Sequence, residues 1–206
     1  MTALRLAGPG DVDTVADIVA EAFLQLAVIA YLVPDPARRR TVSRDWYRLF
    51  IEHAIDGAGQ VVMTEDATAA AIWFDRTGDV TEPHDYAKRL AELAGDDLPR
   101  FQHLDHQMDT HHPGHRHWHL LFLAVRPENW RHGLGSALME HTHRQLDADG
   151  IAAYLEATNE ENRLLYQSHS YSTMSPATIP VTPGTVLHRM WRPARAADTT
   201  ASPALV

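Results

Sequence analysis

Apolar residues recur at helical spacing near the start of the chain, and this periodicity predicts two helices. Asp11 follows a break at Pro9-Gly10 and is a suitable N-cap for the first helix. The apolar positions of that helix share one face and are Val12, Val15, Ile18, Val19, Ala22 and Phe23. A second helix is expected to begin after Pro34-Asp35-Pro36 and to end at Gly57 and Gly59. A short strand at residues 3–7 is expected before both helices.

Short apolar runs bounded by turn residues predict strands in the rest of the chain. They lie at residues 60–64, 68–74, 117–125, 152–157, 171–179 and 185–191. The run HWHLLFLAV at 117–125 is apolar enough to suggest burial on both faces. Further helices are expected in the polar segment after residue 75, from about residue 134 to 150, and at 162–169. This mixture predicts one α/β (or α+β) domain over 1–193, with a helical insertion at about 76–114 and a flexible tail at 194–206.

Composition narrows the possible functions of the 206-residue chain. It has no cysteine, which excludes a disulfide scaffold, a thiol nucleophile and a thiolate metal site. Its formal net charge of −9 disfavours nucleic-acid binding. A signal-like leader is not evident, and a membrane-spanning run of about 18 apolar residues does not occur. We therefore expect a cytoplasmic protein with neither a membrane nor a nucleic acid as partner.

The most informative segment runs from Val125 to Ser136, where a predicted buried strand leads through a Gly-x-Gly turn into a helix. The first turn of a helix presents free backbone N–H groups, and glycine lets a phosphate approach them closely. Arg131 and His132 add positive charge beside that turn. A simple tight turn is the alternative interpretation. A dinucleotide fingerprint is excluded because Leu138 occupies its third glycine position, and a triphosphatase loop is excluded because its lysine is missing.

The motifs that follow this segment make its functional interpretation more specific. The run LAVRPENWRHGLGSAL, followed by YLEAT, NRLLY and HSY, resembles the GNAT N-acetyltransferase superfamily. Its order and loop lengths most resemble puromycin N-acetyltransferase-like small-molecule acetyltransferases. The resemblance implies a mixed, mostly antiparallel sheet flanked by helices. It also implies that acetyl-CoA lies as cosubstrate between two splayed parallel central strands, here 117–125 and 152–157.

The same resemblance implies roles for particular residues. The backbone of Leu123, Ala124 and Val125 would pair with the pantetheine arm. The pyrophosphate would be held by Arg131, His132, Gly133, Leu134, Gly135 and Ser136. Asn162 would contact the cofactor, and Tyr166 would protonate the leaving thiolate. Two positions depart from the family pattern: Trp130 stands where Gln or Arg is usual, and Ser170-Tyr171 stands where Gly-Phe is usual.

The amine that attacks the thioester must lose a proton, and two residues are candidates for the base. Glu156 lies in a predicted half-buried strand, where a carboxylate needs a partner or a raised pKa. His119 lies on the other predicted central strand and titrates near neutrality. A structural hydrogen bond is the alternative role for Glu156.

Seven of the 14 histidines lie between His103 and His119, and with Asp105 and Asp109 they form a possible zinc site. The helical His-x-x-x-His pair with a catalytic Glu is missing, and acetyl transfer requires no metal. A polar loop or a substrate pocket is the simpler interpretation, and we expect no metal.

The sequence therefore predicts an N-acetyltransferase that acts on an amine of a small molecule through a ternary complex. The resemblance suggests an antibiotic or another secondary metabolite, acetylated for self-resistance or tailoring. A protein or peptide N-acetyltransferase and a non-catalytic acyl-CoA-binding module are the alternatives. The oligomeric state, monomer or homodimer, is left open.

Overall fold

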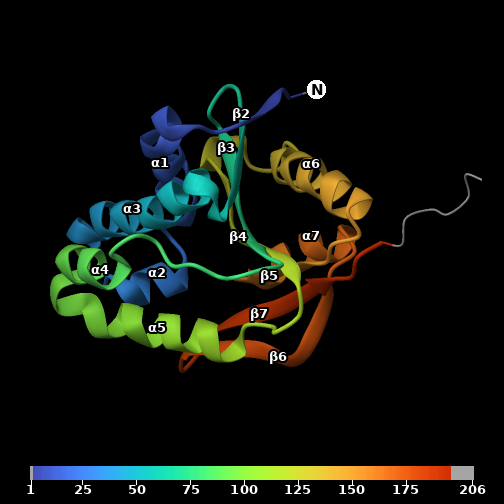
Figure 1. The fold of residues 1–206 in the computed structure, drawn as a ribbon. Helices are drawn as coiled ribbons and strands as arrows, with labels where there is room; N and C mark the ends of the chain where they lie inside the picture. The colour runs from blue at the N-terminus through green and yellow to red at the C-terminus, as the bar shows by residue number, and fades with distance from the viewer. Residues whose placement is uncertain (1, 196–206) are drawn as a thin grey trace, which may run out of the picture.

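The computed structural model describes residues 2–195, and within them a seven-stranded sheet has the order β1-β2-β3-β4-β5-β7-β6 (Figure 1). The strands are β1 Leu4–Leu6, β2 Gly59–Thr64, β3 Ala69–Arg76, β4 His117–Val125, β5 Ala153–Ala157, β6 Ser172–Thr182 and β7 Thr185–Arg192. Neighbouring strands are antiparallel except β4 and β5, which are parallel. This is the mixed, mostly antiparallel sheet with a parallel central pair that the sequence predicted.

Helices cover both faces of this sheet (Figure 1). They are α1 Val12–Phe23, α2 Ala27–Leu32, α3 Pro36–His53, α4 Tyr86–Ala94, α5 Leu98–His111, α6 Leu134–Ala148 and α7 Glu160–Ser168. Single helical turns lie at Gly95–Asp97, between α4 and α5, and between a strand and a helix at Pro9–Asp11, Ala54–Ala58 and Pro127–Asn129. Among the described residues, no helix is both long and apolar enough for a membrane crossing.

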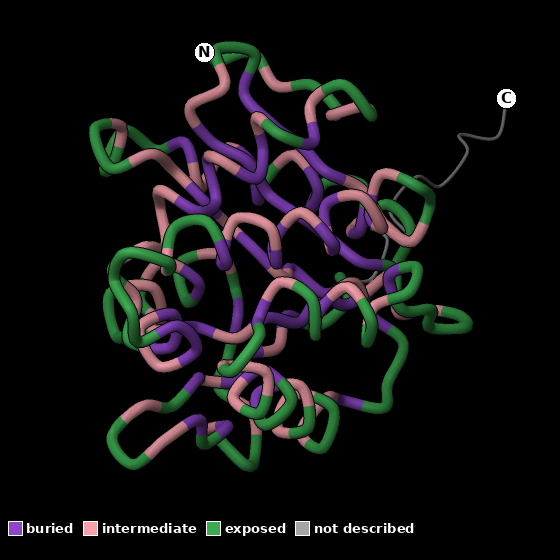
Figure 2. Tube along the Cα trace, turned by 90° about the vertical axis from the view of Figure 1, so that its left-hand side faces the viewer, coloured by how far each residue is buried: buried purple, intermediate pink, exposed green. Residues whose placement is uncertain are grey.

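Side chains along each strand point alternately to the two faces of the sheet, and the core is accordingly divided into two clusters, one on each face. In β3, Ile72 and Phe74 pack with the helices α1, α3, α4 and α5, whereas Ala71 and Trp73 pack with α6 and α7. Successive side chains of a strand point to opposite faces, so a strand in the middle of a three-layer structure must be apolar on both. The central strands are accordingly among the most buried segments of the chain (Figure 2).

Local sequence explains the start of α3. Asp35 is its N-cap and accepts a hydrogen bond of 2.9 Å from the backbone N–H of Ala37, while Pro36 occupies the first helical position. Asp11 precedes α1 as expected, but its side chain does not cap that helix. Instead its carboxylate accepts hydrogen bonds from the Arg5 guanidinium and from the backbone N–H of Gly8.

Most predicted elements are confirmed, with small shifts at their ends. The sequence reasoning missed α2, whose six residues show too little periodicity to indicate a helix. The prediction that β4 is buried on both faces was only partly right. Phe122 and Ala124 are buried, whereas Leu121, Leu123 and Val125 are half-buried. Of the tail predicted at 194–206, residues 196–206 lie outside the described residues.

Candidate active site

The parallel strands β4 and β5 separate beyond a short stretch of pairing. Trp118–Leu120 align with Ala153–Leu155, and no further aligned pair follows in the described strands, although β4 continues to Val125. On its other side β4 pairs with β3, and Leu121 is an extra residue in that ladder. Such a bulge bends and twists its strand. The main-chain groups of β4 beyond the bulge therefore face an opening where β5 would otherwise continue the sheet.

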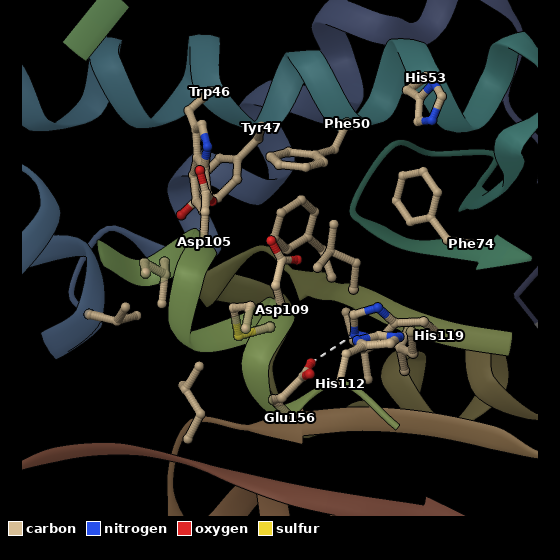
Figure 3. Close-up of a pocket in the computed structure, with 18 of the residues that line it drawn as sticks. Trp46, Tyr47, Phe50, His53, Phe74, Asp105, Asp109, His112, His119 and Glu156 are labelled. Atoms are coloured by element: carbon tan, nitrogen blue, oxygen red, sulfur yellow. Dashed lines mark hydrogen bonds and ion pairs between the residues drawn. The ribbon is translucent and has the colours of Figure 1, made fainter. Parts of the chain in front are cut away.

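A cavity of about 360 Å³ reaches this opening from the side of the sheet that α1, α3, α4 and α5 cover (Figure 3). The volume falls at the lower end of the range for small-molecule sites, about 300–1,000 Å³. Apolar and aromatic side chains form most of its wall, and the polar groups gather in two places. One group lies at the splayed strands, and the other lies beside α3, α4 and α5.

At the splayed strands, Glu156 and His119 form a buried hydrogen-bonded pair. The distance from His119 Nε2 to Glu156 Oε2 is 2.8 Å, and their side chains are only 3% and 5% exposed. His119 Nδ1 and Glu156 Oε1 have no hydrogen-bond partner among the described residues. Both side chains line the cavity. The pair can therefore accept a proton from a ligand without first breaking another bond at those atoms.

Tyr166 of α7 also lines the cavity and is 7% exposed. Burial raises the pKa of its phenol strongly, and the nearby Glu156 charge raises it further. The hydroxyl therefore keeps its proton at neutral pH. The structure thus brings together Glu156, His119 and Tyr166, which the sequence reasoning had placed on three separate elements.

A second histidine pair lies next to this cluster. His117 Nδ1 donates to the carbonyl oxygen of His115 at 2.6 Å, so its Nε2 accepts from His112 Nε2 at 3.2 Å. Burial lowers the pKa of His117 to about 4 and that of His112 to about 2, so both rings are neutral. Within residues 2–195, no three His, Cys, Asp or Glu side chains are arranged to hold a metal ion.

The glycine turn lies at the start of α6. Gly133 is the N-cap with φ +76, a left-handed conformation that favours glycine, and no side chain caps the helix there. The first N–H groups of α6 are therefore available to an anion. The neighbouring Arg131 is mostly exposed and forms an ion pair of 3.1 Å with Glu161. Ser136 directs its hydroxyl to His169 Nε2 at 3.0 Å.

The two departures from the family pattern have structural consequences. The indole Nε1 of Trp130 donates a hydrogen bond of 2.7 Å to the carbonyl oxygen of Val125, at the end of β4. The indole is 55% exposed and lies outside the described set of residues that line the cavity. Ser170 has φ +71, so the turn keeps a glycine-like conformation without glycine. The next residue, Tyr171, is buried and bonds His143 Nε2 through its hydroxyl at 3.0 Å.

Beside α3, α4 and α5, Asp105 is held by a short chain of hydrogen bonds. Tyr86 Oη donates to its carboxylate at 3.0 and 3.2 Å, and Trp46 Nε1 donates to Tyr86 Oη at 3.3 Å. Burial raises the pKa of Asp105 to about 6. The sequence gives no sign of this arrangement, because Trp46 and Tyr86 occur at the spacing of helix-packing positions.

Among the other predicted cofactor residues, Leu123 and Asn162 line the cavity. Asn162 also bonds the Thr158 hydroxyl at 3.0 Å, which fixes its side chain above the end of β5. Ala124 is fully buried and does not line the cavity. The glycine turn and its neighbours lie outside the described residues that line the cavity, next to the end of β4.

An opening between parallel strands, a glycine turn at a helix start and a buried acid–base cluster together suit acyl transfer from a phosphate-bearing donor. The Acetyltransferase (GNAT) family model matches residues 99–171. That match covers β4, α6, β5 and α7, the elements that form this site.

Solved structures with the same fold include the Corynebacterium glutamicum protein named histone acetyltransferase HPA2 and related acetyltransferase. It is 25% identical, with a TM-score of 0.73 over 96% of this chain and 99% of that one. The PaiA N-acetyltransferase of Thermoplasma acidophilum, solved with coenzyme A, is 11% identical, with a TM-score of 0.57 over 94% and 99%. The ribosomal-protein-S18-alanine N-acetyltransferase of Escherichia coli is 18% identical, with a TM-score of 0.54 over 98% and 99%.

The segment that forms the splayed-strand end of the site thus matches the GNAT acetyltransferase family, and the chain shares its fold with solved acetyltransferases. These similarities indicate an N-acetyltransferase that uses acetyl-CoA as its cosubstrate.

Proposed function

We propose that this enzyme acetylates a primary amine of a small molecule bound in the cavity, through a ternary complex with acetyl-CoA. One observation carries the proposal: the cavity of about 360 Å³ ends at the splayed strands beside the pair Glu156–His119. Helices α3, α4 and α5 contribute to its walls, so the acceptor site is a pocket of small-molecule size.

The acetyl-CoA site suggested by this geometry is made largely of main chain. Beyond Leu120, the main chain of β4 has no strand partner on the β5 side. Leu123–Val125 can therefore offer the pantetheine amides the hydrogen bonds that a neighbouring strand would make, except at the Val125 carbonyl, which accepts from Trp130. The free N–H groups of residues 134–136 lie where the diphosphate is expected, with Gly133 permitting the turn. Acetyl-CoA, when bound, supplies the activated acetyl group.

The chain's own residues then move protons. As the amine nitrogen bonds to the thioester carbon, its proton passes to the pair Glu156–His119, directly or through one water molecule. As the carbon–sulfur bond breaks, the phenol of Tyr166 donates its proton to the leaving sulfur. The proton held by the pair then restores the phenol, so the cycle ends with free coenzyme A and an amide.

The test is thiol release with a panel of primary amines, followed by mass spectrometry of the products. An increase of 42 mass units in an amine, dependent on the enzyme, is expected, since acetylation adds about that mass by replacing hydrogen with C₂H₃O. Acetylation of none of the amines, despite calorimetric binding of acetyl-CoA, would refute the proposal. A negative control is available in Glu156→Gln, which removes the proposed base while preserving side-chain size.

The finer resemblance to puromycin N-acetyltransferase-like enzymes favours an antibiotic or another secondary metabolite as acceptor, with self-resistance or tailoring as the role. The formal net charge of the chain, −9, is compatible with a cationic acceptor. Expression in a sensitive bacterial host tests this role. An increase in the inhibitory concentration of an amine antibiotic supports it, and an unchanged sensitivity to the whole panel opposes it.

The second candidate is an acyl-CoA-binding module without turnover, and the position of Trp130 favours it. Its indole uses the Val125 carbonyl, which the pantetheine arm would otherwise bond. Calorimetry that detects coenzyme A binding, together with no acetylation of the amine panel, would support this candidate. Turnover of any amine would exclude it.

A further inference from the structure

The cavity walls contain more information about the acceptor than the reaction class alone. The Phe, Tyr and Trp rings that line the cavity come from six elements. Several pack edge to face, as in Trp46–Phe50 at 5.5 Å and 88° and Tyr47–Phe122 at 5.0 Å and 76°. Phe74 of β3 completes this wall near His53 (Figure 3). A ligand enclosed by such rings gains most when it is itself flat and apolar, or when it places a cation on a ring face.

Charged groups in the wall are mostly of one sign. Four carboxylates but only one guanidinium occur among the described lining residues: Glu82, Asp105, Asp109 and Glu156 against Arg76. The Arg76 guanidinium carbon lies 5.9 Å from the ring centroid of Phe74. Glu82 and Asp109 are exposed, so this excess of carboxylates attracts cations most strongly at the less exposed Asp105 and Glu156.

The carboxylates also have an order along the cavity. Asp105 and Asp109 are four residues apart on α5, so they occupy one face of that helix, about 6 Å apart along its axis. Figure 3 shows Asp105 beside Trp46, far from the reacting end, and Asp109 between it and Glu156. Asp105 and Glu156 therefore offer two positions for an amine nitrogen, one at each end of an aromatic-walled space.

Asp105 is prepared for a cationic partner that the protein itself does not supply. Its carboxylate is held by the Tyr86 hydroxyl, a neutral donor. No arginine or lysine forms an ion pair with it among the described residues, in contrast to the carboxylates of Glu52 and Asp97, which pair with arginine. Asp105 is half-buried, and partial burial of a carboxylate without a counter-ion is costly, so an incoming cation would be favoured.

We propose, on the basis of the proposed acetyl transfer, that the acceptor is an amine that contains an aromatic ring and carries a second protonated nitrogen. Its reacting amine lies at Glu156–His119, its ring lies against Trp46, Phe50 and Phe122, and its second nitrogen is bound by Asp105 with Asp109 nearby. An amine with a ring but only one nitrogen lacks the contact with Asp105. An aliphatic diamine lacks the contacts with the aromatic rings.

Three probes separate these features: 1,4-bis(aminomethyl)benzene, benzylamine and 1,6-diaminohexane. The aromatic diamine is expected to have kcat/KM at least tenfold above both others, which exceeds the twofold statistical advantage of a symmetric molecule. In Asp105→Asn this preference over benzylamine should fall to about threefold or less, since a tenfold preference corresponds to about 1.4 kcal/mol of lost charge pairing. Asp96→Asn is the matched control, because Asp96 is exposed in the turn before α5 and outside the described cavity lining; it should keep the full preference.

Calorimetric titration of the aromatic diamine into the coenzyme A-bound protein gives a readout that does not depend on turnover. Binding that Asp105→Asn weakens about tenfold, without turnover of any probe, supports the recognition site and refutes acetyl transfer. Equal turnover of the aromatic diamine and benzylamine refutes the recognition site but leaves acetyl transfer standing. An aromatic diamine that is neither bound nor acetylated, or a preference that survives in Asp105→Asn, also overturns the inference. Acetyl-CoA affinity should be the same in wild type and both variants.

Discussion

Replacement of Glu156 by glutamine removes the charge of the proposed base while preserving side-chain size. The amide can keep a hydrogen bond to His119 Nε2, which lies 2.8 Å from the present carboxylate oxygen. The change therefore isolates proton acceptance from packing. It also leaves the main-chain groups of β4 and the turn before α6 untouched, so acetyl-CoA affinity should not change.

The size of the effect follows from the buried position of the pair. With side chains 3% and 5% exposed, bulk water has little access to replace the carboxylate. A positioned base contributes about 10²–10⁴-fold, or about 3–5 kcal/mol of barrier, and we expect kcat/KM to fall within that range. Folding should be less affected, by about 1–3 kcal/mol, because an amide leaves one buried polar group without a partner.

Steady-state thiol release measures this loss, with calorimetry for acetyl-CoA and urea unfolding for stability. A second signature is the pH profile: without the Glu156 carboxylate the pair loses its negative charge, so the amine must lose its proton in solution before it reacts. The rate of Glu156→Gln should therefore rise about tenfold per pH unit until the pKa of the amine is reached. A variant within threefold of wild type, with unchanged folding and binding, would exclude Glu156 as the base.

Four further changes test other parts of the structure. Tyr166→Phe should lower kcat about 10²-fold and leave acetyl-CoA binding by calorimetry unchanged, whereas a full rate would remove the hydroxyl from the mechanism. Gly133→Val should weaken acetyl-CoA binding and destabilise the fold by about 1–2 kcal/mol in urea, because φ is +76 there, and unchanged affinity would argue against this turn as the diphosphate site. Ser170→Gly should stabilise the fold by about 1 kcal/mol, because it relieves φ +71, and a loss of stability would contradict the strain at this turn. Burial lowers the pKa of His143 from 6.5 to about 3, so the unfolded chain binds the proton first and the free energy of unfolding declines as pH falls below 6.5. His143→Gln should reduce the slope of unfolding free energy against pH by about 1.4 kcal/mol per pH unit. An unchanged slope would contradict the neutral burial of this side chain.

The strand, turn and helix start of the proposed acetyl-CoA site could be predicted from the sequence, because these elements depend on local pattern. A buried strand, a glycine turn and a helix start are contiguous between residues 117 and 136, and each has a signature that survives without tertiary information. Gly133 is required by its positive φ, and the free N–H groups follow from any helix start. The bulge at Leu121 that opens the sheet has no such signature, because it depends on how β3 and β4 align.

The pairing of Glu156 with His119 could be anticipated only in part. Each was a candidate on its own strand, but their contact requires that the two strands be adjacent, parallel and in the observed register, with His119 opposite Tyr154. A shift of one residue in that register would have sent Glu156 to the other face of the sheet. The sequence therefore named both residues without deciding between them, and the geometry makes them one hydrogen-bonded pair.

The individual residues of the proposed acceptor half could not be identified from the sequence, because each also fits a purely structural role. Trp46 and Phe50 repeat at helical spacing and do pack into the apolar core, as the periodicity indicated. The same side chains also line the cavity, and nothing in their spacing separates these two roles. Asp105 looked like one member of a polar, histidine-rich segment until Tyr86, 19 residues earlier, was found to hold its carboxylate.

This difference between the two halves bears on specificity. The proposed donor half consists of main-chain groups of residues 123–125 and 134–136, which most side-chain substitutions leave in place. The proposed acceptor half consists of side chains of α3, α4 and α5, which lie outside the splayed strands. Substitutions there can change which amine is bound without disturbing how acetyl-CoA is held, provided that they preserve the volume of the core that Trp46 and Phe50 also fill. Specificity in this enzyme is therefore coupled to folding stability at the acceptor wall and largely uncoupled from cosubstrate affinity.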